Sequence, residues 1–115
     1  AYTSDLVEES ILSTRVELTG STTAGETLNL DMNTGRHFAI VLQAPTTLAI
    51  TNMIPVNKNT VFTAYITGAF LETLPVGSVG DPYNDTADLS KKRKYTFHIE
   101  KGGSSPIISY SLINV

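Results

Sequence analysis

The sequence predicts an all-β fold, namely an antiparallel, jelly-roll-like β-sandwich of about eight short strands in a single domain spanning residues 1–115. Along most of the chain, apolar side chains recur with a period of two rather than 3.6. Turn signals separate these runs roughly every 8 to 14 residues, a spacing typical of sandwiches and small barrels. A chain of 115 residues also buries enough surface for one core that needs neither metal nor disulfide.

Residues 1–19 are expected to form an N-terminal arm and the first strand. The stretch "SDLVEESIL" is the one plausible short helix, with Ser4 as its N-cap and acidic side chains near the positive end of its dipole. "ILSTRVEL" and "ETLNL" then predict the first two strands. Ala1 is the kind of residue that removal of an initiator Met exposes, so the chain is either a nearly complete small gene product or a domain cut from a longer one.

The middle of the chain predicts three strands and a fourth, shorter one. In "RHFAIVLQ" and "NTVFTAYIT", alternate apolar residues share one face, and in the first of them the opposite face is also fairly apolar, which suggests a strand covered on two sides. "TTLAIT" and "FLETLP" supply the other two. Two further runs, "KYTFHIE" and "PIISYSLINV", predict the closing strands, and the first of them alternates most clearly. Between these groups, residues 75–94 form the longest irregular segment, and a loop of that length in a compact domain is usually functional or disordered.

The composition excludes several classes of function. A net charge of -3 provides no electrostatic attraction to nucleic acid or to an acidic membrane. The absence of cysteine removes disulfides, zinc–thiolate sites and thiol catalysis together. No apolar run is long enough for a membrane-spanning helix, and the first residues lack the basic and apolar regions of a secretory signal. The sequence also predicts no cofactor.

The irregular segment contains the best candidate for a contact loop. Asp81, Asp85 and Asp88 place carboxylates close together in sequence, and of Tyr65, Tyr83, Tyr95 and Tyr110 only Tyr83 lies outside the alternating runs. The spacing matches no calcium loop, so the favoured interpretation is a solvated turn in which the acids cap local backbone N–H groups. The following "KKRK", residues 91–94, is interpreted as charge that protects the start of a strand from edge pairing.

No catalytic set is visible. His37 follows a turn and His98 lies on the polar face of its strand, and nothing in the sequence fixes a carboxylate or nucleophile near either ring. The chain contains no P-loop, GxGxxG, HExxH or GxSxG motif. The protein is therefore predicted not to be an enzyme.

The stretch "LDMNTGRHFAIVLQAPTTLAITNM", followed by "TVFTAYITG", resembles a module of tailed-bacteriophage virion proteins found in tail fibres, baseplate-associated proteins and small head or fibre proteins. Its pattern is a Leu-Asp-Leu segment, a polar turn with Gly, a strand with Phe, a "TTL" strand and a turn with Asn and Pro. The resemblance covers roughly residues 24–113. Met32 stands in place of the usual Leu, and the Trp often present in the module's late loop is missing.

Within this pattern, five residues are expected to hold the fold. Asp31 fastens the polar turn through side-chain–backbone hydrogen bonds, and Gly35 takes a positive φ there. Phe38, Leu48 and Phe62 meet across the sheets as core anchors.

The resemblance implies a capsid decoration, cement or head-fibre protein of the virion, made in the host cytoplasm. Its expected partners are further copies of itself, as a trimer, and other virion proteins such as the major capsid protein, with no nucleic acid and no membrane. The alternative is a tail-fibre domain that recognises a receptor or carbohydrate through Tyr83 and its loop.

Overall fold

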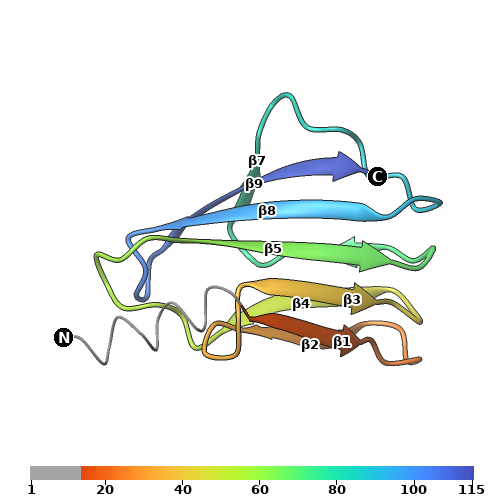
Figure 1. Ribbon diagram of the computed structural model, residues 1–115, viewed down its shortest axis with the longest axis horizontal. Coiled ribbons are helices and arrows are strands. Elements are labelled where there is room, and N and C mark those ends of the chain that lie inside the picture. Colours follow the sequence, from red (N-terminus) through yellow and green to blue (C-terminus); the bar gives the residue numbers. More distant parts are fainter. Residues whose placement is uncertain (1–13) are drawn as a thin grey trace.

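The computed structural model describes residues 14–115 (Figure 1), which contain nine strands in two sheets and no helix. The strands are β1 (Arg15–Thr19), β2 (Glu26–Asp31), β3 (His37–Val41), β4 (Thr46–Thr51), β5 (Thr60–Thr67), β6 (Glu72–Thr73), β7 (Ser78–Gly80), β8 (Arg93–Glu100) and β9 (Ile107–Asn114). The six-stranded sheet has the order β1-β3-β5-β8-β9-β7, and the three-stranded sheet has the order β2-β4-β6.

The first six strands form three stacked coils. The chain alternates between the two sheets, so that β1, β3 and β5 lie parallel in one sheet and β2, β4 and β6 lie parallel in the other. Equivalent positions stack from coil to coil: Arg15 pairs with His37, and His37 pairs with Thr63. Each coil therefore repeats the inward and outward side-chain directions of the coil before it.

The last strands close the larger sheet. β8 runs antiparallel to β5, β9 runs antiparallel to β8, and the short β7 pairs parallel with the outer edge of β9. In Figure 1 these strands lie above the stacked coils, and the segment between β7 and β8 forms a loop at the top of the view.

The core combines side chains from both sheets. Its buried apolar members are Leu30, Met32, Phe38, Ile40, Leu42, Leu48, Ile54, Phe62, Ala64, Ile66, Tyr95, Phe97, Ile99, Ile108 and Leu112. An aromatic row crosses the larger sheet at its centre: the ring of Phe62 stacks on Phe97 with 4.8 Å between centroids and meets the edge of Phe38 at 5.9 Å. These contacts tie the stacked coils to the closing strands.

The prediction of an all-β fold is confirmed for the described residues, but the predicted sheet layout is wrong. The structure has nine strands rather than about eight, and five of the seven strand pairings in the described part of the chain are parallel, which excludes a purely antiparallel jelly roll. Period-two alternation reports which face of a strand is buried, but it carries no information about the partner or its direction.

Two further differences between prediction and structure concern the N-terminal segment and β7. The segment around Ser4 that was expected to be helical, and the arm that precedes Thr14, lie outside the described residues. The strand β7 was not predicted, because its three residues lie within the irregular segment 75–94. No helix able to span a membrane occurs in the part of the chain that the structure describes.

Candidate functional site

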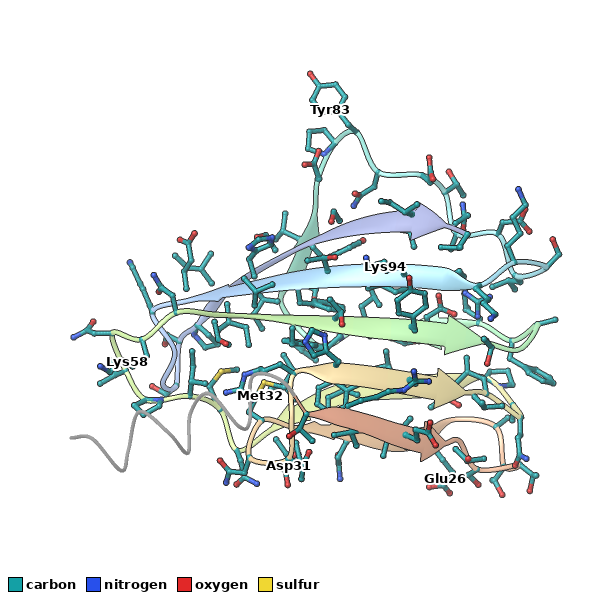
Figure 2. The ribbon with its side chains drawn as sticks, in the orientation of Figure 1. Glu26, Asp31, Met32, Lys58, Tyr83 and Lys94 are labelled. Atoms are coloured by element: carbon teal, nitrogen blue, oxygen red, sulfur yellow. The ribbon has the colours of Figure 1, made fainter. Side chains whose placement is uncertain are left out.

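The contact loop was predicted within the irregular segment 75–94, and in the structure the contact loop is residues 81–92, which connect β7 to β8 and present Tyr83 at their tip. The side chain of Tyr83 is 94% exposed and points away from both sheets (Figure 2). An aromatic ring with so little contact to its own protein contributes nothing to the core. It is, however, available to a partner, and tyrosine is among the residues that contribute most to binding interfaces.

Side-chain amides fasten this loop to the edge of β9. The Asn84 amide donates to the carbonyl of Tyr110 at 3.1 Å and accepts from the N–H of Leu112 at 2.9 Å. Asn114 reciprocates at the far end of β9, accepting from the N–H of Asp88 at 3.0 Å and donating to the carbonyl of Thr86 at 2.8 Å. These bonds replace the ladder that a further strand would make, so the loop is held rather than free.

The three aspartates of the loop are used for backbone capping, each at a different place. Asp81 accepts from the N–H of Tyr83 at 2.9 Å, and Asp85 accepts from the N–H of Asn114 at 3.4 Å. Asp88 accepts from both the hydroxyl and the N–H of Ser90, which lowers the pKa of its carboxyl group. In residues 14–115 no three His, Cys, Asp or Glu side chains gather closely enough to hold a metal ion.

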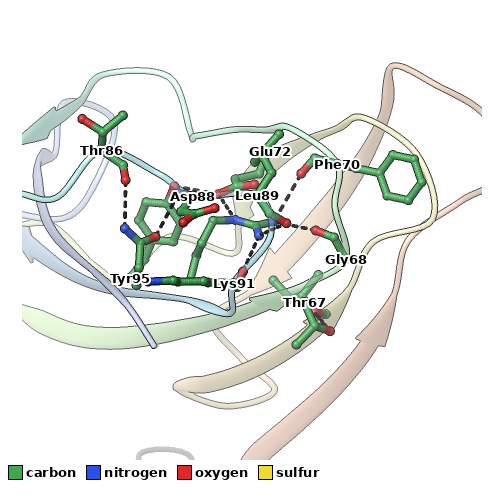
Figure 3. A network of polar contacts seen from close by, with 12 residues as sticks. Thr67, Gly68, Phe70, Glu72, Thr86, Asp88, Leu89, Lys91 and Tyr95 are labelled. Atoms are coloured by element: carbon green, nitrogen blue, oxygen red, sulfur yellow. Dashed lines mark hydrogen bonds and ion pairs between the residues drawn. The ribbon is translucent and has the colours of Figure 1, made fainter.

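Arg93, from the "KKRK" run, has a role that the sequence reasoning missed. β8 is an interior strand of the sheet, so the run does not protect an edge. The Arg93 side chain is fully buried, and its Nε donates to Glu72 Oε1 at 2.8 Å. Its other nitrogens donate to four carbonyls (Figure 3), those of Gly68, Phe70, Leu89 and Lys91. One guanidinium thereby joins β6, β8 and the two loops beside them.

Tyr95 completes this buried network. Its hydroxyl donates to Glu72 Oε1 at 2.7 Å, and burial, this bond and the carboxylate charge all raise the pKa of Tyr95. Glu72 Oε2 is buried without a hydrogen-bond partner among the described residues. The signal in the sequence was Glu72, the one charged residue of the run "FLETLP": once its side chain is buried, its carboxylate needs a cation or hydrogen-bond donors beside it.

The outer face of the six-stranded sheet, defined as the side opposite the core, is the second candidate surface. It carries a shallow hollow of about 580 Å³ over β1, β3 and β5, whose lining includes Arg15, His37, Tyr65 and Lys92. The Lys94 ammonium lies 5.6 Å from the centre of the Tyr65 ring. Exposed apolar side chains on the same face are Val41, Val61, Val79, Ile107 and Ile113.

Both histidines lie on the outer face of the six-stranded sheet. His37 Nδ1 lies 3.0 Å from the hydroxyl of Thr63, its neighbour on β5, at the margin of the hollow. His98 is exposed on β8 and faces Val61 and Ser109 across the sheet.

Asp31 fastens the polar turn as expected and also reaches the next coil. Its Oδ1 accepts from the N–H of Asn33 and from the side-chain amide of Asn52, both at 2.8 Å. Gly35 differs from the expectation, because it does not have a positive φ. A Cβ there would stand 2.6 Å from the carbonyl oxygen of Thr14, so glycine is needed for close approach of the backbone.

Arg36 is a further residue that the sequence reasoning missed. Its guanidinium donates to the carbonyls of Met32 and Gly35 and, at 3.1 Å, to the hydroxyl of Thr60. It thus braces the polar turn against the start of β5. The expected core anchors Phe38, Leu48 and Phe62 are all buried, with Leu48 on the smaller sheet and the two phenylalanines on the larger one.

Comparison with known proteins adds no relative: no protein-family model, no curated protein and no solved structure matches this chain.

Proposed function

We propose that the protein is a structural component of a tailed-bacteriophage virion, a capsid decoration, cement or head-fibre protein that binds neighbouring virion subunits. It is made in the host cytoplasm and becomes part of the virion as a homo-oligomer, a trimer by the resemblance. Its partners are other virion proteins such as the major capsid protein, and it binds neither nucleic acid nor membrane. It has no catalytic role and no cofactor.

The observation that supports this proposal is that the polar side chains with several hydrogen bonds form them within the protein itself. The hydrogen bonds of four polar side chains join strands and loops to one another: those of Arg93, Glu72, Asn84 and Asn114. The outer face of the six-stranded sheet and the exposed Tyr83 are left for contact with a partner. We infer that the two sheets form the layers of a sandwich, since the core draws on both. Such a double layer is stiff, as a unit that bears load between neighbours has to be.

The outer face has the composition of an interface that is neither purely apolar nor strongly charged. Val41, Val61, Val79, Ile107 and Ile113 are between 45% and 66% exposed on it, interleaved with serine and threonine. These side chains are dispersed over the face: His98 and Ser109 stand between Val61 and Val79, and Ile113 lies beside Lys94. They would supply the apolar part of a contact with a virion neighbour, and the hydroxyls would supply its hydrogen bonds.

Two measurements test the proposal. Immunogold electron microscopy of virions with antibody against this protein should place label on the head or its fibres, and virions without label would overturn the proposal. Light scattering of the purified protein should give a mass well above the 12.4 kDa of one chain. A mass of one chain at every concentration would remove the oligomer from the proposal.

A receptor-binding tail-fibre domain is the second candidate, and the exposure of Tyr83 favours it. A tyrosine that is 94% exposed on a pinned loop suits stacking on a sugar ring. Glycan-array binding that is lost in Tyr83→Ala would support this function. Because Tyr83 makes no core contact, the variant should fold normally, and unchanged binding would exclude the loop as the recognition site.

A further inference from the structure

The two edges of the six-stranded sheet differ in whether other described residues form hydrogen bonds along them. At one edge, β7 and the amides of Asn84 and Asn114 cover the outer side of β9. At the opposite edge, no described strand pairs with the outer side of β1. The three-stranded sheet likewise ends at β2, whose outer side pairs with no described strand, and Glu26 and Asp31 mark that edge at the bottom of Figure 2.

The hydrogen bonds to β3 decide which groups of β1 face outward. The N–H of Gly20 donates to Val41, and the carbonyl of Thr14 accepts from Arg36, so even-numbered residues turn their backbone groups toward β3. Because these directions alternate along a strand, Arg15, Glu17 and Thr19 turn theirs to the outer side. This edge is thus a row of donors and acceptors suited to another strand.

The core is also less covered at this end. Val16, Leu18 and Leu28 point inward but are only partly buried. Their register partners in the next coil, Phe38, Ile40 and Leu48, are no more than 2% exposed. Among the described residues, the second coil has a neighbouring layer on each side, whereas the first coil has one only on the side of the second coil.

We propose that a second copy of this chain supplies that layer, with its β1 antiparallel to the first β1 across a two-fold axis through Val16. In this register Arg15 of each copy lies opposite Glu17 of the other. The backbone groups of both residues point away from β3 and toward the other copy, so the two residues exchange backbone hydrogen bonds. Registers centred on Arg15 or on Glu17 instead place two like charges directly opposite. Of the two-fold registers centred within β1, only the one centred on Val16 places opposite charges directly across from each other.

The same axis joins the smaller sheets. Because this axis runs perpendicular to the sheets, the outer edge of β2 in one copy meets the outer edge of β2 in the other. Leu28 is then covered by its own chain on one side and by the second copy on the other. The contact is isologous, in that one surface meets itself, which is the commonest interface in soluble oligomers. It continues both layers of the fold from one chain into the next.

This inference goes beyond the proposed function and stands without it. If single chains associate through this two-fold contact, the product is a dimer. If a separate three-fold contact also forms trimers, the two-fold contact joins two trimers. A trimer that edge variants leave unchanged would overturn the inference alone. A dimer that edge variants convert to monomer would support it and overturn the trimer.

A single introduced cysteine tests the register. The chain has no native cysteine, so any disulfide must join two copies. Val16 would face its own copy at a non-hydrogen-bonded position, with about 4.5 Å between Cα atoms, within the range of a disulfide. On mild oxidation of dilute protein, Val16→Cys should give a covalent dimer much faster than Val61→Cys, whose exposed thiol on the sheet face couples only through random collisions. If Val16→Cys stays monomeric, because the chain's own first residues or a different protein cover the edge, the proposal fails.

A charge swap tests the pairing independently. Arg15 and Glu17 are exposed, with side chains 69% and 78% accessible, so their substitution leaves the core intact. Glu17→Arg turns two attractive cross-strand pairs into repulsive ones and should weaken self-association on the order of 10- to 30-fold in analytical ultracentrifugation. The double variant Arg15→Glu with Glu17→Arg should restore it. Glu100→Arg, with the same charge change away from the edge, should have no effect, and failure of the double variant to recover would overturn the proposed register.

Discussion

Arg93 and Glu72 form an ion pair with 2.8 Å between Nε and Oε1, and neither side chain has any exposure to solvent. The pair connects the end of the third coil, at β6, with the first residue of β8, where the antiparallel part of the larger sheet continues. Tyr95 adds a hydrogen bond to the same carboxylate oxygen. The junction between the two halves of the fold is therefore held by a polar network inside an otherwise apolar interior (Figure 3).

Breaking this pair on one side should be severe. Arg93→Met leaves the Glu72 carboxylate buried and uncompensated, and we expect the free energy of unfolding to fall by about 3–5 kcal/mol. Urea unfolding followed by circular dichroism measures it. The matched control is Lys92→Met, an exposed neighbour of equal charge, which should change stability by less than about 0.5 kcal/mol. Equal effects of the two variants would contradict the assigned role of Arg93.

Gly35→Ala should destabilise the protein although the backbone there is ordinary. The added Cβ would meet the Thr14 carbonyl oxygen at 2.6 Å and Val16 Cγ2 at 2.8 Å, so β1 must shift, at a cost of roughly 1–3 kcal/mol. Gly20→Ala is the matched control, since its Cβ would meet nothing closer than 3.4 Å. Thermal unfolding of the two variants compares them directly. A Gly35→Ala protein as stable as the wild type would show that the first coil is loosely packed.

The hydrogen bonds between Asn84 and β9 are predicted to hold the contact loop in place. Asn84→Ala removes two hydrogen bonds to β9 and should lower stability by about 1–3 kcal/mol, with faster amide hydrogen exchange across residues 81–88. Tyr83→Ala in the same loop should leave both quantities unchanged, because its ring is almost wholly exposed. Fast exchange in the wild-type loop would mean that these bonds do not hold it.

Asp31 should make stability depend on acid pH. The Asn52 amide and the Asn33 N–H favour its charged form in the folded protein, so the pKa of Asp31 lies below the ordinary value of 3.8 that applies to the unfolded chain. A lowered folded pKa adds stability above 3.8, and that contribution is lost as the pH falls through the folded pKa. The advantage of the wild type over Asp31→Asn should therefore shrink below pH 3.8 in unfolding measurements. A difference that is independent of pH would rule out titration of this group as its source.

Much of the secondary structure could be predicted because alternation is a local property. The buried faces of β3, β5 and β8 follow from Phe38, Phe62 and Phe97 and their neighbours two residues away, and all three rings are buried. The fastening of the turn by Asp31 was also readable, since an aspartate two residues before a turn N–H makes that bond within one short segment.

The parts that could not be predicted depend on residues distant in sequence. The partner of Arg93 is 21 residues away on another sheet, so "KKRK" read alone looks like a solvated run. The need for glycine at position 35 comes from Thr14 and Val16, which no local pattern connects to that turn. In the same way, Asn84 is an ordinary loop residue until β9 is placed beside it.

By itself, the sequence determined that this chain is built of strands, which side of each strand is apolar, and where most turns fall, because side-chain direction along a strand depends only on position parity. Only the tertiary structure decided that the first six strands stack in parallel coils, that Arg93 is interior, and that β1 is left as an edge. Strand partners are selected by the packing of the whole core and by the path of the connections, and both are properties of the assembled chain rather than of any one segment.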